Sequence, residues 1–369
     1  MYQLLFVIHG MGSGDRGSDA GNWSDGVLKS LLGAAEPFGL SKRLKVTNPK
    51  SGDVLVVPLT YHQFFDETRT KWATEQPHRD AWAALLKGLL GGASTVAGGK
   101  DAEAKVDEWL VSATGFFWSH ILDVLLYRFS GDHMAPIRNH VASEIAKAWS
   151  QADFINDART PVHFVAHSLG TAVLHDALCT LAAEPGFGPA TQRINTILTL
   201  ANVSSVLQTN FDPYREANRP VSAPPSPGGM TERFIYCRHD VDPIPAVKPF
   251  DAEKHGWPVD GWDEEVLVDI KEWNVHGYTH YLDNPDAHLQ LFERVWPTID
   301  WASRWEAARQ KYRESAGAKC PQAIAALRES LRNVIRAIKA DDVFEAIETG
   351  IMAYSAMEKA RDSCRQEAQ

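Results

Sequence analysis

The chain has 369 residues, of which 44% are hydrophobic and 23% charged, a composition typical of a soluble globular protein. Its formal net charge of −10, without a dense Lys/Arg cluster, argues against nucleic acid as the main ligand. Such a length fits one elaborated domain or a domain with an appendage. Four cysteines lie far apart without a C-x-x-C pair, so we expect reduced, mostly buried thiols and neither a zinc knuckle nor a disulfide framework.

The first apolar run covers residues 3–8 and ends in the glycine-rich turn His9-Gly10-Met11-Gly12. Because no basic region or cleavage site accompanies this run, we interpret it as a core strand and expect a cytoplasmic protein. The turn lacks the Lys-Ser/Thr of a phosphate-binding loop and the third glycine of a dinucleotide fingerprint. We expect His9 to be a buried, hydrogen-bonded residue that shapes the turn. Apolar residues at helical spacing follow, namely Val27, Leu28, Leu31 and Leu32.

A second strand is expected at residues 53–61, and the pattern then changes. Residues 63–135 carry leucines and aromatic residues at helical spacing in two groups, which we interpret as an inserted helical cap that covers the candidate site described below. The longest charge-free piece, 109–122, is too short for a transmembrane helix, which needs about 20 apolar residues. Contact with a membrane surface, an acyl-binding role and simple packing on the core all stay open for this segment.

The centre of the chain predicts a strand, a tight turn and a helix. An apolar, β-branched run at 160–165 precedes Ser168, and a helical pattern follows at 171–178. A second helix, expected at 136–149, leads into this strand. A nucleophilic hydroxyl needs such a turn, because small neighbours avoid clashes and the helix N-terminus offers N–H groups to a developing oxyanion.

The segment Ala166-His167-Ser168-Leu169-Gly170 resembles the nucleophile elbow of serine hydrolases of the α/β-hydrolase superfamily, especially lipase- and esterase-like members. Alanine takes the place of the first glycine. The turn after the first strand resembles their H-G-x-G loop. Over residues 1–300, the resemblance implies an α/β-hydrolase fold, a mostly parallel doubly wound sheet with helices on both faces. It also implies an oxyanion hole formed by the main-chain N–H groups of Met11 and Leu169.

Two further partners are expected from the family's chain order of nucleophile, acid and base. Strands are expected at 193–200, 232–237 and 265–270, with a proline-rich loop at 212–229. The resemblance assigns the acid to Asp242, in a D-P-I-P context, with Asp240 as the alternative. The base follows the last strand. Counting from that strand favours His276, whereas nearness to Tyr281 leaves His280 open.

Residues 301–369 have helical patterns and form an expected C-terminal extension. One apolar stripe runs from Ile324 to Ile338 and another from Val343 to Met357. Such stripes usually belong to a core, so we expect packing, while dimerisation or coverage of the site stays open.

The expected activity is hydrolysis of carboxylic esters of small molecules or acyl lipids, through a Ser-His-Asp triad and an acyl-enzyme. This scheme needs no metal or organic cofactor. The alternatives are a thioesterase, amidase or acyltransferase with the same residues, or a catalytically inactive scaffold that binds a ligand or partner. Substrate identity and oligomeric state are left open.

Overall fold

The computed structural model describes residues 1–10, 23–65, 67, 127, 131–184, 187, 192–207, 230–242, 245–246, 249–250, 263–315, 320–337 and 343–367. The expected proline-rich loop lies outside the described residues, as does nearly all of the expected cap.

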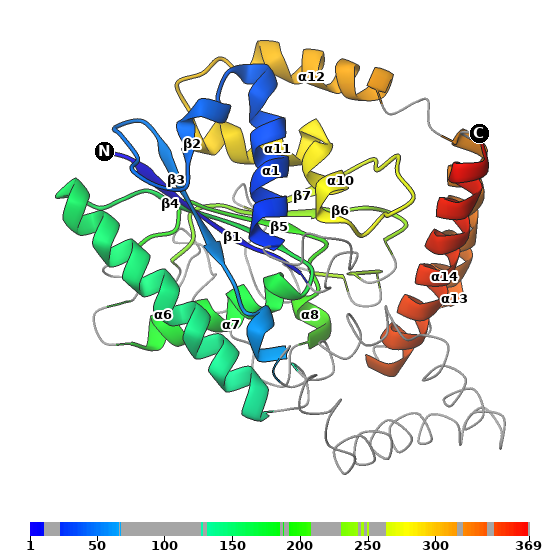
Figure 1. Cartoon of the computed structure of the whole chain (residues 1–369), viewed down its shortest axis with the longest axis horizontal. Helices are drawn as coiled ribbons and strands as arrows, with labels where there is room; N and C mark the ends of the chain where they lie inside the picture. The colour runs from blue at the N-terminus through cyan, green and yellow to red at the C-terminus, as the bar shows by residue number, and fades with distance from the viewer. Residues whose placement is uncertain are drawn as a thin grey trace.

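The described residues contain a 7-stranded sheet in which all neighbouring strands pair in parallel, in the order β2-β3-β1-β4-β5-β6-β7 (Figure 1). The strands are β1 (Gln3–Ile8), β2 (Leu44–Lys45), β3 (Val54–Leu59), β4 (Val162–His167), β5 (Thr196–Leu200), β6 (Phe234–Arg238) and β7 (Asp263–Leu267). An α/β architecture is therefore confirmed. The sequence pattern missed β2, because a strand of two residues has no readable period.

Helices cover both faces of the sheet (Figure 1). The helices of the described residues are α1 (Trp23–Ala35), α6 (Gly131–Asn156), α7 (Leu169–Ala183), α8 (Ser204–Leu207), α10 (Tyr278–Asp283), α11 (Pro285–Val295), α12 (Ala302–Ser315), α13 (Pro321–Ala337) and α14 (Val343–Glu367), with 3-10 turns η1 (Glu36–Phe38) and η2 (Ser41–Arg43). Helices α6 and α7 lie on one face, and α1 and α11 lie on the other.

Strand β1 shows why both faces are covered. Its side chains alternate between two cores, because successive residues of a strand point to opposite faces. Leu4 and Phe6 belong to the core beneath α6 and α7, whereas Leu5 and Val7 belong to the core beneath α1 and α11. Both sets are buried, so the strand reads as one continuous apolar run, as is usual for parallel sheets.

The two edges of the sheet differ from its centre. Strand β2 consists of two residues, and β7 begins with three acidic residues. Glu264 of β7 lies 2.9 Å from Arg233, and Glu265 forms an ion pair with Arg238 of the neighbouring strand. Neither edge therefore presents a long apolar strand.

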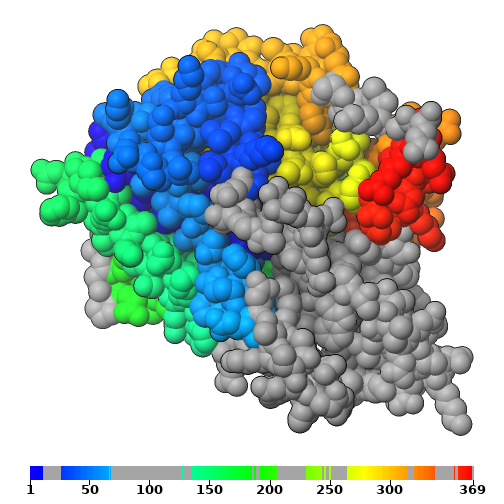
Figure 2. All heavy atoms as spheres, in the orientation of Figure 1, coloured from blue at the N-terminus to red at the C-terminus, as the bar shows by residue number. Residues whose placement is uncertain are grey.

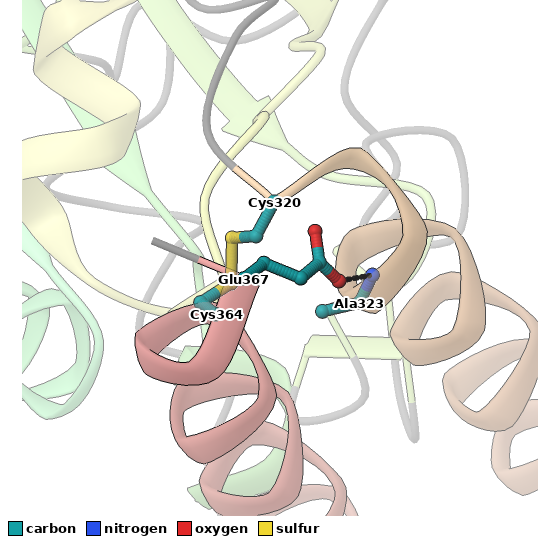
Figure 3. The surroundings of a disulfide bond; sticks show 4 residues. All are labelled: Cys320, Ala323, Cys364 and Glu367. Carbon is teal, nitrogen blue, oxygen red and sulfur yellow. Dashed lines mark hydrogen bonds between the residues drawn. A yellow bond between two sulfur atoms is a disulfide. The ribbon is translucent and has the colours of Figure 1, made fainter. Parts of the chain in front are cut away.

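The expectation for the cysteines is wrong in part. A disulfide joins Cys320, just before α13, to Cys364 in the last turns of α14 (Figure 3). Cys179 and Cys237 take no part in this bond. No local pattern indicated the bond, because the two cysteines are 44 residues apart in the chain, and the pairing of α13 with α14 brings their Cα atoms to 4.9 Å.

Among the helices that the structure describes, none combines the length and the apolar character required to cross a membrane.

Candidate functional site

Ser168 occupies the sharp turn between β4 and α7. Its backbone has φ 51° and ψ −128°, a conformation that residues other than glycine rarely adopt. The surrounding packing must hold it in place. The turn also requires small neighbours. A Cβ on Gly170 would lie 2.2 Å from the carbonyl oxygen of His9, and a Cβ on Gly10 would lie 2.6 Å from the Cβ of Ser168. The strand-turn-helix predicted at this point is thus confirmed.

A chain of hydrogen bonds leads from Ser168 to an imidazole and then to a carboxylate. The hydroxyl oxygen of Ser168 lies 2.8 Å from Nε2 of His276. Nδ1 of the same ring lies 2.8 Å from Oδ2 of Asp242 and 3.1 Å from its Oδ1. An ionised carboxylate only accepts, so Nδ1 carries the proton, and Nε2 is left to accept from the serine hydroxyl.

These three residues come from separate parts of the chain, and the parallel sheet brings them together. Ser168 follows β4, Asp242 follows β6, and His276 follows β7. The carboxyl ends of parallel strands lie at one edge of a sheet, which is where ligand crevices of open α/β sheets form. The side chains of Ser168 and Asp242 are 3% and 0% exposed, so little bulk water competes for their bonds.

The carboxylate of Asp242 has a second donor that the sequence analysis did not identify. The hydroxyl of Tyr281 in α10 donates to Oδ2 over 2.9 Å and accepts from the backbone N–H of His239 over 3.1 Å. Burial, together with the nearby Asp242 charge, raises the pKa of Tyr281 well above its usual value. The phenol therefore stays protonated and continues to donate. Tyr281 had appeared only as a landmark for locating the base.

His167, the residue before the serine, contacts the backbone of His276. Its Nε2 donates to the carbonyl oxygen of His276 over 2.7 Å, and the two rings lie 5.2 Å apart. The sequence offered no signal for this contact, because it connects the elbow to a loop 109 positions away.

The expected oxyanion donors are only partly within the described residues. Leu169 is the first residue of α7, so its N–H has no acceptor within the helix. Met11 lies outside the described residues. His9 is buried and its Nδ1 bonds the carbonyl oxygen of Gly10, as expected. Its ring stacks on Tyr61 at 4.9 Å, and burial lowers its pKa to about 4, which keeps it neutral.

The alternative acid and base lie elsewhere. His280 lines a pocket of about 820 Å³ that is also bordered by Phe38 and α12, and burial lowers its pKa to about 4. Asp240 is 46% exposed, and its carboxylate lies 3.6 Å from Arg332 of α13. Of the paired candidates, the structure thus joins His276 and Asp242 to Ser168.

Within the described part of the chain, no group of three or more His, Cys, Asp or Glu side chains is arranged to hold a metal ion. Comparison of the chain with protein-family models, with curated proteins and with solved structures gave no match.

Proposed function

We propose that the protein is a serine hydrolase of the α/β-hydrolase type that cleaves carboxylic esters. The observation that carries this proposal is the pair of 2.8 Å contacts that connect Ser168 to His276 and His276 to Asp242. A serine next to a buried imidazole is common enough by chance. A serine on a strained turn, bonded to the correct nitrogen of an imidazole whose other nitrogen meets a buried carboxylate, matches the geometry that acyl transfer needs.

In the first step, the Ser168 hydroxyl attacks the acyl carbon of the ester while Nε2 of His276 takes its proton. The resulting imidazolium is stabilised by Asp242, which also holds the ring in the tautomer that accepts at Nε2. Collapse of the tetrahedral intermediate breaks the bond to the alkoxy oxygen. His276 gives its proton to that oxygen, the alcohol leaves, and the acyl group stays on Ser168.

In the second step, water attacks the acyl-enzyme, with His276 again acting as base and then as acid. The products are the carboxylic acid and free Ser168. The negative oxygen of both tetrahedral intermediates is bound by the N–H of Leu169. Each such donor lowers the barrier by about 3–4 kcal/mol in enzymes of this kind. Met11, the second donor expected by resemblance, stays a prediction.

A fluorophosphonate probe tests the proposal, because it reacts only with an activated serine. We expect the native protein to be labelled at Ser168 and to hydrolyse p-nitrophenyl esters, and Ser168→Ala to do neither. A folded native protein that is neither labelled nor active on p-nitrophenyl esters contradicts the proposal and favours a binding scaffold. Labelling without ester turnover points to thioesters, amides or an acyl acceptor other than water.

Paired variants test the assignment of base and acid. We expect His276→Ala and Asp242→Asn to lower kcat by about 10⁴-fold, as loss of a triad member does elsewhere. The matched variants His280→Ala and Asp240→Asn should keep most of the activity, since those side chains lie in the pocket and at the surface. The reverse pattern would reassign both roles.

A cytoplasmic location stays a prediction, and the disulfide argues against it. Disulfides persist mainly in oxidising compartments, whereas cytosolic thiols are usually kept reduced. Acyl lipids as substrates also stay a prediction, because the segment expected to form the cap lies outside the described residues.

A further inference from the structure

The C-terminal hairpin of α13 and α14 packs directly against the loops that carry the acid and the base. Val241 and Val275, which precede Asp242 and His276 in the chain, are both buried in a small apolar cluster. The hairpin supplies the rest of its buried members, which are Leu327, Leu331, Ala353, Met357 and Ala360. Figure 2 shows the red surface of α14 beside the yellow surface of the segment that includes α10.

Polar contacts extend this attachment along the segment that leads from β7 to His276. Arg328 of α13 donates to the carboxylate of Asp269 over 2.6 Å and to the carbonyl oxygen of Ile270 over 2.7 Å. The guanidinium of Arg361 in α14 lies 5.9 Å from the ring of Trp273. The hairpin therefore contacts this segment at Asp269, Ile270, Trp273 and Val275.

The disulfide joins the two helices of the hairpin at the end opposite residues 338–342. Residues 338–342 connect the two helices at one end, while Cys320–Cys364 joins the start of α13 to the end of α14 at the other (Figure 3). Beside the bond, the carboxylate of Glu367 accepts from the N–H of Ala323 over 3.0 Å, so one orphan donor of the first turn of α13 is satisfied.

We propose that the α13–α14 hairpin is a positioning element that holds the acid and base loops in register with Ser168, and that the disulfide keeps it in this state. The proposal rests on the proposed function. Its residues touch neither substrate nor reacting atoms and act through Val241 and Val275. The geometry is demanding, because a base displaced by about 1 Å costs about 10²-fold in rate.

Two variants loosen the hairpin in different ways. Cys320→Ser/Cys364→Ser opens its end, and Leu331→Ala removes a fully buried side chain from the cluster. We expect each to lower kcat for p-nitrophenyl esters by about 10-fold or more, with KM changed less than about twofold, because the loss concerns alignment in the transition state and not substrate binding.

A matched control is Leu181→Ala in the last turn of α7. This leucine is equally apolar and 3% exposed, but it belongs to the core on the face of the sheet covered by α6 and α7. We expect it to lower the thermal midpoint while leaving kcat within about twofold of the native value. Equal losses of kcat in Leu331→Ala and Leu181→Ala would mean general destabilisation and would overturn the proposal.

A readout that does not depend on turnover separates this proposal from the proposed function. The proton on Nδ1 of His276 is bonded to Asp242, and its NMR signal can be assigned by its loss in His276→Gln. We expect it to exchange with water at least about tenfold faster in the two hairpin variants than in the native protein or in Leu181→Ala. Faster exchange in the two hairpin variants, combined with a native protein that fails to react with fluorophosphonate, supports the positioning role of the hairpin and rejects the hydrolase. Unchanged exchange and unchanged kcat in the hairpin variants reject the positioning role of the hairpin and leave the proposed hydrolase activity unaffected.

Discussion

At the scale of single residues, the carboxylate of Asp242 is the group that depends most on hydrogen-bond donors around it. It is fully buried, and an ionised group away from water must be compensated by donors. The imidazole of His276 and the hydroxyl of Tyr281 supply such donors. Tyr281 therefore has two effects: it lowers the cost of burying the charge and fixes the plane in which the carboxylate meets the imidazole.

We expect Tyr281→Phe to lower kcat by about tenfold and to cost about 1–3 kcal/mol of stability. The variant leaves the backbone N–H of His239 without its acceptor and Asp242 without one donor. Ester turnover and urea unfolding measure the two effects separately.

The matched control is Tyr127→Phe, which removes another buried phenol that donates to a carboxylate, here Asp176 over 2.6 Å. We expect a comparable loss of stability with kcat unchanged. A native kcat in Tyr281→Phe would show that His276 alone orients the acid.

Ser168 was predictable because its signal is local: a strand, a small-residue turn and a helix follow one another directly in the chain. For the acid and the base, the sequence left two candidates each, since neighbouring Asp or His residues in one loop look alike until the backbone fixes their directions. The supports from His167 and Tyr281 escaped prediction because each bond connects segments that are remote in the chain.

At the scale of elements, the elbow depends on how closely α7 crosses the end of β1. The nearest approach is at Gly170, where any side chain would meet the backbone of His9 and Ile8. Helix and strand can therefore remain this close only without a Cβ at that position.

We expect Gly170→Ala to cost at least about 3 kcal/mol of stability or to prevent folding, because the added methyl would overlap backbone that cannot rotate away. The control is Gly33→Ala in α1, where a Cβ would meet nothing within 4 Å. That change should be neutral or stabilising by about 1 kcal/mol, since alanine is the better helix former. Denaturant unfolding measures the stability of both variants, and equal stability would contradict the close approach of α7 to the end of β1.

Elements with a regular apolar pattern were the predictable ones. The first strand was expected at residues 3–8 and is β1, Gln3–Ile8. The hairpin helices were expected as well, but the surface against which they pack was not. An apolar stripe indicates that one face of a helix is buried. Its spacing does not identify the surface that covers this face, nor does it predict the disulfide that joins the two helices.

At the scale of the whole molecule, several histidines are buried in the neutral form. Burial lowers the pKa of His9, His280 and His288 to about 4 and that of His163 to about 3, from a usual value near 6.5. The unfolded chain therefore binds more protons than the folded one between pH 6.5 and about 4. Stability is fully present above pH 6.5 and is lost as the pH falls through this window.

We expect the free energy of unfolding to fall by roughly 5 kcal/mol between pH 7.5 and 5.5, at about 1.4 kcal/mol for each of these four histidines. Urea titrations at the two pH values measure the difference. In His163→Gln, the difference in unfolding free energy between the two pH values should be smaller by about 1.4 kcal/mol, whatever the effect of the substitution on stability at pH 7.5. A pH difference that is identical in the native protein and the variant would exclude His163 as a contributor.

The edges of the sheet also determine how copies of this molecule can meet. An incoming strand needs a partner with a row of free backbone groups and no unfavourable charge. In the described residues, one edge strand consists of two residues, and at the other edge the incoming strand would run beside the carboxylates of Glu264 and Glu265. For the part of the chain that the structure describes, growth of the sheet from one copy into the next is thereby disfavoured, and we expect any self-association to use side-chain surfaces and not backbone pairing.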